Sequence, residues 1–188
     1  MKTVLVFLIT LLLGACATTP VTETAADKAA NKVLLDQAVA LYEQKNYAQA
    51  QPLFEQAAIK GQMKASRYLG LMYLNGEGVA KCPQRAPGAF KLAAERGHIT
   101  GRYWLGYLYE HGIGTAKDLT QAFYWYGQAA GTRIDHVTAP AMTALGRFYE
   151  QGIATAADQA KAIEWYRKAA STGDADAQAA LQRLGVQQ

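Results

Sequence analysis

The chain has few cysteines, few prolines and few charged residues for its length of 188 residues, and each scarcity excludes a class of protein. Two cysteines exclude a disulfide scaffold, and five prolines exclude a proline-rich fibre. Charged residues make up 18% of the chain and hydrophobic residues 51%, which excludes a disordered polymer and predicts a buried core. The formal net charge of +4 is small, so we expect no nucleic-acid partner.

Motifs of metal, cofactor and hydrolytic sites are also missing. The three histidines, His98, His111 and His136, form no pair spaced four residues apart, and the sequence contains no Cys-x-x-Cys. It contains no Gly-x-Ser-x-Gly, no phosphate-binding loop and no dinucleotide fingerprint. We therefore expect no catalytic residue, no metal and no cofactor.

The first fifteen residues have the layout of a secretory signal peptide. Lys2 supplies one positive charge, Val4–Leu13 is apolar apart from Thr10, and small residues follow. The apolar run is too short for a transmembrane helix, which needs about 20 apolar residues. We therefore expect residues 1–15 to direct export and to be removed.

A Leu-Gly-Ala-Cys sequence ends at Cys16 and resembles the lipobox of bacterial lipoproteins. The resemblance implies cleavage before Cys16, a diacylglycerol on its sulfur and a fatty acyl chain such as palmitate on its amino group. Several acyl chains on one residue anchor a protein stably. Ala17 follows in place of aspartate, which in this family favours the outer membrane over the inner one. The resemblance thus implies an outer-membrane lipoprotein that faces the periplasm, with residues 16–26 as a flexible tether.

Internal repetition is the strongest pattern in the sequence. Six positions around Leu69 recur 36 residues later and again after a further 40 residues, as identical or similarly small side chains. Four positions around Phe90 recur at the same offsets. The first set is Ala65, Leu69, Gly70, Tyr73, Gly76 and Gly78, then Gly101, Leu105, Gly106, Tyr109, Gly112 and Gly114, then Ala141, Leu145, Gly146, Tyr149, Gly152 and Ala154.

The apolar residues of each unit have helical spacing. Leu69 and Tyr73 stand four residues apart, as do Phe90 and Ala94 in the second half of the unit. No comparable stretch alternates with a period of two, so we expect no strands. One helix pair cannot bury its apolar face alone, but stacked neighbours can. The sequence therefore predicts an all-α fold, an α-solenoid of stacked antiparallel helix pairs.

The units resemble the Sel-one-like repeat (SLR), a relative of the tetratricopeptide repeat. The resemblance rests on the pattern Leu-Gly-x-x-Tyr-x-x-Gly-x-Gly and on the Trp-Tyr pairs at 125–126 and 165–166. It implies three SLR units over residues 63–173. Residues 27–62 resemble a shorter, tetratricopeptide-like opening helix pair, and residues 174–188 are expected to form a capping helix and tail.

In the related tetratricopeptide fold, the first helix of each pair lines a concave ligand surface. The resemblance therefore implies a partner-binding face on the outward residues beside each Leu-Gly pair. These are Arg67, Leu71 and Asn75 in the first unit, Tyr103, Tyr107 and His111 in the second, and Thr143, Arg147 and Gln151 in the third. Tyrosine and arginine are frequent in binding hot spots. Tyr103 and Tyr107 stand one turn apart, with Arg67 and Arg147 in the neighbouring units, so we expect an extended peptide or loop that carries acidic groups. The alternative is that the tyrosines only extend the packing between units.

One position at the start of the second helices departs from the pattern. It reads Asn46, Cys82, Asp118 and Asp158 along the chain, and asparagine and aspartate are good N-caps. A thiol at a helix N-terminus lies in a positive field that lowers its pKa. Cys82 is therefore a possible reactive thiol; the alternative is a tolerated substitution of the cap.

Three further features interrupt the repeats. Pro87 lies inside a predicted second helix, so we expect this helix to be kinked or to start late, near Ala86. Pro52 poses the same problem in the opening unit. Four extra residues within 131–140 predict a lengthened loop, which either contacts the partner or is a neutral surface insertion.

We interpret the chain as a lipid-anchored periplasmic repeat protein that binds another protein. One version is a scaffold or assembly factor of an envelope complex. A second is an immunity protein that inhibits a toxin delivered to the periplasm. A third, a cell-wall or β-lactam hydrolase, is disfavoured, because the related repeat proteins with that description carry paired cysteines in each unit and this chain has none.

Overall fold

The computed structural model describes residues 24–186, and this part of the chain is all-α, as the sequence predicts. The signal peptide, Cys16 and most of the expected tether lie outside the described residues. None of the helices in this part is long and apolar enough to cross a membrane. The helices are α1 (Ala25–Glu43), α2 (Tyr47–Ile59), α3 (Met63–Asn75), the 3₁₀ helix η1 (Pro83–Arg85), α4 (Ala86–Glu95), α5 (Ile99–His111), α6 (Leu119–Ala130), α7 (Ala139–Gln151), α8 (Gln159–Ala170) and α9 (Ala175–Arg183).

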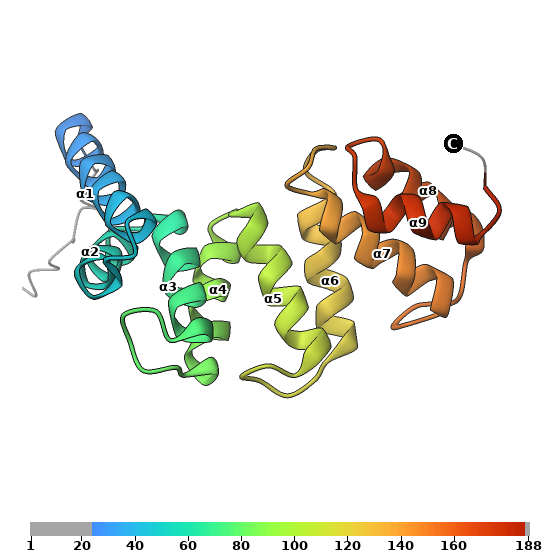
Figure 1. Ribbon diagram of the computed structural model, residues 1–188, viewed down its shortest axis with the longest axis horizontal. Helices are drawn as coiled ribbons and strands as arrows, with labels where there is room; N and C mark the ends of the chain where they lie inside the picture. The colour runs from blue at the N-terminus through green and yellow to red at the C-terminus, as the bar shows by residue number, and fades with distance from the viewer. Residues whose placement is uncertain (1–23, 187–188) are drawn as a thin grey trace, which may run out of the picture.

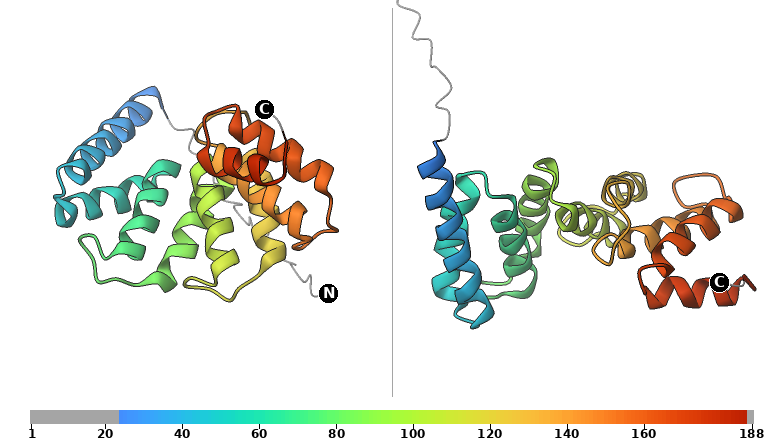
Figure 2. Two further views of the ribbon diagram at one scale, coloured as in Figure 1. Left: turned by 45° about the vertical axis from the view of Figure 1, so that its right-hand side comes forward. Right: turned by 90° about the horizontal axis from the view of Figure 1, so that it is seen from above.

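The helices follow one another in a row from α1 at one end to α9 at the other (Figure 1). Each helix packs against its neighbours in sequence, which gives four antiparallel pairs followed by α9. Figure 2 shows from above that both ends of the row bend toward the same side, so one face of the molecule is concave. The fold is therefore a solenoid with an open inner face rather than a closed bundle.

In each unit, a glycine on the first helix faces an aromatic ring on the second helix, and the missing side chain lets the two helices approach closely. The glycine of each Leu-Gly pair lies directly under an aromatic ring of the second helix, and the rings are buried. A Cβ added to Gly106 or Gly146 would lie only 3.0 or 2.6 Å from the facing ring. The pairs are Gly70–Phe90, Gly106–Tyr126 and Gly146–Tyr166. The repeated Leu-Gly pattern therefore encodes the close approach of the two helices.

The two internal prolines behave differently. Helix α4 begins at Ala86, directly after η1, so the late start expected from Pro87 is confirmed. Proline is tolerated in a first turn, where its missing N–H has no partner to lose. At Pro52, where we expected a kink or a late start, the late start does not occur, because α2 begins at Tyr47 and runs through this residue. Pro52 is exposed, so the carbonyl that loses its partner remains accessible to water.

Aspartate caps two of the second helices, as their sequence positions predict. Asp118 accepts a hydrogen bond from the N–H of Gln121 and Asp158 from that of Lys161, each at 2.9 Å. Asn46 makes no such bond, so its expected capping role is wrong. At the start of the chain, Thr24 caps α1, which begins at Ala25, so the last two residues of the expected tether are helical.

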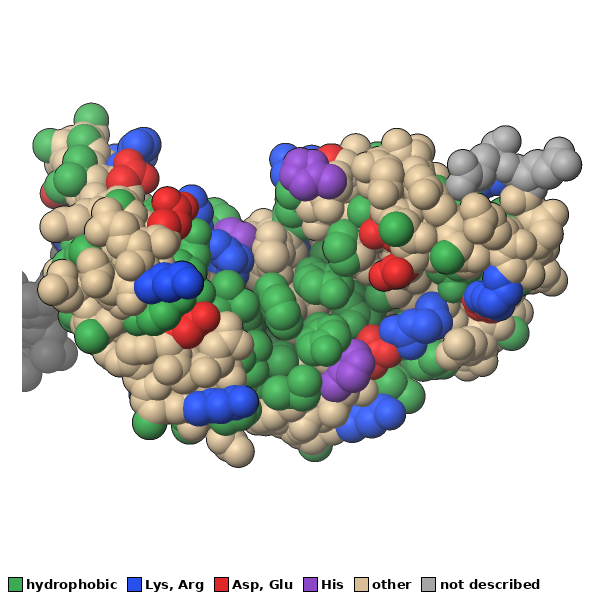
Figure 3. Space-filling model, viewed as in Figure 1, with side chains coloured by type: hydrophobic (Ala, Val, Ile, Leu, Met, Phe, Trp, Pro, Cys, Tyr) green, Lys and Arg blue, Asp and Glu red, His purple; other side chains and the backbone are tan. Residues whose placement is uncertain are grey.

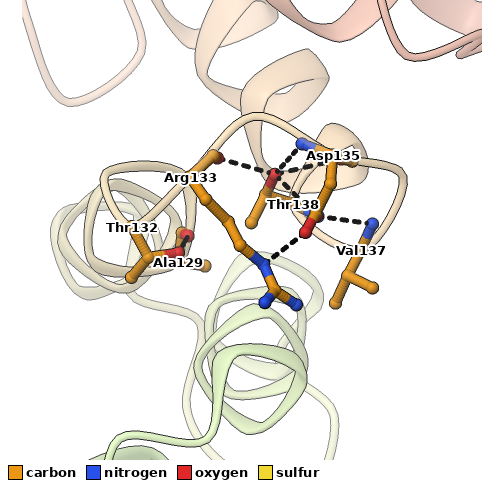
Figure 4. Close-up of polar contacts among 6 residues, drawn as sticks. All are labelled: Ala129, Thr132, Arg133, Asp135, Val137 and Thr138. Carbon is orange, nitrogen blue, oxygen red and sulfur yellow. Dashed lines mark hydrogen bonds and ion pairs between the residues drawn. The ribbon is translucent and has the colours of Figure 1, made fainter.

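The inserted loop is ordered by its own side chains (Figure 4). The Asp135 carboxylate accepts hydrogen bonds from the N–H groups of Val137 (2.9 Å) and Thr138 (3.0 Å), and it also pairs with Arg133. The buried Thr138 hydroxyl donates to the Arg133 carbonyl at 2.9 Å. Helix α7 begins at Ala139, so the loop ends earlier than the predicted 131–140.

Candidate binding groove

A groove crosses α5, α7 and α9 on the concave face. It consists of two adjoining hollows, of about 530 and about 430 Å³, which share Thr143, Arg147 and Asp176. In Figure 3, hydrophobic side chains cover the middle of this face, and charged side chains lie beside them toward the α9 end. The larger hollow brings together five of the residues predicted for the binding face, which are Tyr103, Tyr107, His111, Thr143 and Arg147, whereas Gln151 does not line it.

The predicted residues on α3 lie outside the two hollows. The guanidinium of Arg67 stacks over the ring of Tyr68, 4.1 Å from its centroid. Leu71 is partly buried against the core, and Asn75 donates a hydrogen bond to Glu77 at 3.1 Å. These three residues therefore extend the inner face beyond the groove but do not line it.

The α5 wall of the groove is aromatic. The rings of Tyr103 and Tyr107 lie 6.4 Å apart between centroids, and Trp104 packs edge-on against Tyr107 at 5.5 Å. His111 continues the series by stacking on Tyr107 at 4.1 Å. Burial raises the pKa of Tyr103, and the neighbouring Tyr107, Glu110 and Asp174 raise it further. The Tyr103 hydroxyl therefore stays protonated and neutral at physiological pH.

A buried carboxylate fixes the floor of the groove. Glu110 is only 9% exposed and accepts hydrogen bonds from the hydroxyl of Tyr126 (2.7 Å) and the guanidinium of Arg147 (2.5 Å). Burial and the hydrogen bond to Glu110 raise the pKa of Tyr126 well above its ordinary value, so this hydroxyl remains a donor. Arg147 is therefore already paired within the protein.

The same three-residue arrangement recurs one unit later. Glu150 accepts hydrogen bonds from the hydroxyl of Tyr166 (2.8 Å) and from both guanidinium nitrogens of Arg183 (2.6 and 2.8 Å). Hydrogen bonds from Arg183 lower the pKa of Glu150. Both glutamates thus join the two helices of their own unit to the first helix of the next. Glu110 and Glu150 therefore have the same structural role at successive junctions.

Helix α9 contributes groove residues that the Leu-Gly pattern does not predict. Asp174 accepts hydrogen bonds from the first turn of α9 and from the Thr143 hydroxyl, both at 2.9 Å, and Asp176 is exposed beside it. Both line the larger hollow. Arg183 stands 36 residues after Arg147, so the repeat offset itself marks α9 as a continuation of the groove wall.

These contacts change the expected ligand. The expectation of an acidic partner rested on Arg67 and Arg147 beside the tyrosines. Arg147 is paired with Glu110, and Arg67 lies outside the two hollows, so neither arginine supplies an unpaired positive charge to the groove. That ion pair is neutral as a unit, so Asp174 and Asp176 leave the hollow with an excess of negative charge. A segment rich in carboxylates would be repelled here.

Cys82 lies outside the groove. It directly precedes η1, a 3₁₀ helix of three residues that leads into α4. Its Sγ contacts the side-chain oxygen of Gln84 at 3.7 Å. Both alternatives for Cys82, a reactive thiol and a tolerated substitution of the cap, stay predictions.

The histidines are dispersed. His98 caps α5 by accepting a hydrogen bond from the N–H of Gly101 at 3.1 Å. Burial lowers the pKa of His98 to about 4, with smaller effects from Arg67 and Lys64, so this imidazole is neutral at physiological pH. Across residues 24–186, no three His, Cys, Asp or Glu side chains gather in a way that suits a metal ion.

Stacked helix pairs with a groove across their first helices define the chain as a helical-repeat protein of the kind that binds other proteins. The Sel1 repeat profile matches residues 64–98, 100–130 and 139–174. The chain therefore belongs to the Sel1 repeat family, which confirms the resemblance drawn from the sequence. Proteins of this family generally mediate protein–protein interactions and are generally non-catalytic.

Solved structures share the fold. A protective antigen of uropathogenic Escherichia coli that displays an SLR fold is 30% identical, with a TM-score of 0.77 over 85% of this chain and 34% of that chain. A Sel1 repeat protein from Oxalobacter formigenes is 31% identical, with a TM-score of 0.73 over 82% of this chain and 64% of that chain. The chain therefore spans about a third of the first protein and somewhat less than two thirds of the second.

The cysteine rich protein B of Helicobacter pylori is a more distant neighbour. It is 24% identical, with a TM-score of 0.52 over 70% of this chain and 96% of that chain, and this likeness shows the fold alone. No curated protein sequence matches the chain.

Proposed function

We propose that the chain is a non-catalytic binding module whose groove across α5, α7 and α9 holds an extended segment of a partner protein. One observation carries the proposal: Tyr103 and Tyr107 remain partly exposed in a hollow of about 530 Å³. Burial of a large aromatic side chain contributes a large favourable free energy, and such side chains are common among binding hot spots. A partner segment in the groove would complete their burial.

The test is affinity capture from envelope fractions with the wild-type chain and the Tyr103→Ala/Tyr107→Ala variant. We expect one or a few partners to be captured by the wild type and lost from the variant. Tyr124→Ala is the matched control, because this tyrosine is 51% exposed and lies outside the groove, so it removes a ring without changing the site. Thermal unfolding checks that all variants are folded. An unchanged partner profile for the double variant would refute the proposed site.

We further propose that Cys16 anchors the chain as a lipoprotein of the cell envelope. There the chain acts as a scaffold or assembly factor of an envelope complex and binds its partner in the groove. The Leu-Gly-Ala-Cys sequence behind a short apolar segment supports this proposal. Cys16 precedes Ala25, the first residue of α1, by nine positions, and nine residues span at most about 30 Å. The groove would therefore stay near the membrane and meet partners there.

Metabolic labelling with a palmitate analogue tests the anchor. We expect the wild type to incorporate the label and to fractionate with membranes, and Cys16→Ser to lose both properties. Cys82→Ser is the matched control, because it removes the other cysteine and should keep the label. Labelling that persists in Cys16→Ser would contradict the anchor, while leaving the proposed groove untouched.

A further inference from the structure

We propose that the groove recognises a lysine or arginine side chain of the partner, followed toward α3 by an aromatic or aliphatic side chain. The inference rests on the proposed function and specifies its ligand: the occupant is a basic–apolar segment of a protein. It reverses the acidic ligand expected from the sequence. Three features of the groove support it, namely its charge, its aromatic wall and its size.

The first feature is unmatched negative charge. Within the larger hollow, the ion pair between Glu110 and Arg147 is closed at 2.5 Å. Asp174 and Asp176 line the same hollow, and neither forms an ion pair with a lysine or arginine of residues 24–186. The Asp174 carboxylate is held in place by the Thr143 hydroxyl and by the first turn of α9. A cation from a partner would therefore meet one carboxylate that is already oriented, that of Asp174, beside the exposed Asp176.

The second feature is the aromatic wall that faces these carboxylates. The faces of tyrosine rings carry negative potential and attract ammonium and guanidinium groups within about 6 Å. Tyr103 and Tyr107 line the same hollow as Asp174 and Asp176. The fold already uses a contact of this kind on α3, where the Arg67 guanidinium lies 4.1 Å from the ring centroid of Tyr68.

The third feature is the shape and chemistry of the groove. Its larger hollow of about 530 Å³ lies within the range of about 300–1,000 Å³ that is usual for ligand sites. Beyond the groove, toward α3, the inner face carries the partly exposed Trp104, which packs against Tyr107, and the partly exposed Leu71. A charged residue followed by an apolar one therefore matches the groove and the inner face that continues from it toward α3.

The proposal is tested by selecting a random peptide display library on the full-length chain in detergent. We expect the selected peptides to be enriched in lysine or arginine next to an aromatic or aliphatic residue. The dissociation constant of the best peptide, measured by fluorescence anisotropy, should rise about tenfold in Asp174→Asn/Asp176→Asn. Added salt should weaken binding to the wild type more than binding to this variant.

The variant removes charge with little effect on structure. Asparagine is as good an N-cap as aspartate and accepts the same hydrogen bonds, so Asp174→Asn keeps the start of α9. Asp118→Asn is the matched control, because Asp118 caps α6 outside the groove and loses the same charge. We expect the control to bind as the wild type does.

The outcomes separate the two levels of the argument. Selected peptides that bind the wild type and lose binding in Tyr107→Ala would leave the proposed function intact. If these peptides are not enriched in basic residues, or if their binding does not respond to Asp174→Asn/Asp176→Asn, this inference is overturned. If no peptide is selected, or if Tyr107→Ala has no effect on binding, both are overturned. Enrichment in acidic residues would restore the expectation drawn from the sequence and refute the inference.

Discussion

At the scale of single residues, Ala154 is a place where the repeat departs from its own pattern. It has φ +56°, while Gly78 and Gly114 occupy the same position with φ +71° and +69°. A left-handed conformation costs a residue with a Cβ about 1 kcal/mol. We therefore expect Ala154→Gly to raise the free energy of unfolding by about 0.5–1 kcal/mol, as measured by urea denaturation.

The reverse change at the equivalent position supplies the control. A Cβ on Gly114 would overlap the carbonyl oxygen of Pro83, so Gly114→Ala should destabilise the fold far more than Ala154→Gly stabilises it. If both variants changed stability in the same direction, backbone conformation would not explain the glycine at this position. The sequence predicts the turn from its Gly-x-Gly pattern, but it does not show that the chain accepts alanine there in a left-handed conformation.

At the scale of elements, the tyrosine–glutamate–arginine arrangement connects successive units. Glu110 is buried and paired, so Glu110→Gln leaves the guanidinium of Arg147 without its carboxylate. Breaking a buried pair by changing one partner costs about 3 kcal/mol or more. We expect Glu110→Gln to lower the free energy of unfolding by about 2–3 kcal/mol in urea denaturation, because Arg147 is partly exposed.

Glu150→Gln is the matched comparison at the next junction. Its partner Arg183 is largely exposed, so the loss there should be smaller than at Glu110. Equal losses at both junctions would contradict a role for burial. The first junction carries Leu74 and Phe90 at the corresponding positions, and both belong to the apolar cluster there, so this junction forms without a tyrosine–glutamate hydrogen bond.

Periodicity predicts the helix pairs but not every boundary between them. The late start of α4 follows from Pro87, because a proline in the first turn loses no hydrogen bond. Pro52 does not delay the start of α2. The cost of an interior proline depends on whether the carbonyl that loses its hydrogen bond is accessible to water, and this exposure depends on the tertiary structure. The end of the inserted loop depends on the hydrogen bonds of Asp135 and Thr138, whose geometry no spacing rule contains.

At the scale of the whole molecule, the sequence indicates which face forms the groove but not the sign of its charge. Position relative to the Leu-Gly pairs places Tyr103, Tyr107 and Arg147 on one face. Arg147 pairs with Glu110, which lies 37 residues away in sequence. This ion pair neutralises the charge of Arg147, one of the two arginines from which an acidic ligand is expected. Asp174 was overlooked because the Leu-Gly pattern fades in the last helix, although the 36-residue offset continues.

Helix α9 therefore has two roles in the molecule, as a cap of the core and as a wall of the groove. Ala177 and Leu181 are buried against the last full unit, so removing residues 174–188 uncovers the apolar surface of that unit. We expect this truncation to lower the midpoint of thermal unfolding, to increase binding of a hydrophobic dye and to promote self-association in size-exclusion chromatography. Leu181→Ala should have the same effects more weakly, with the free energy of unfolding lowered by about 2–3 kcal/mol, because it leaves a cavity but keeps the helix.

Arg183→Ala, which changes an exposed side chain of α9 and keeps its apolar face, is the control that should remain monomeric. A truncated chain that stayed monomeric and unfolded at the wild-type temperature would show that the stack does not need α9 as a cap.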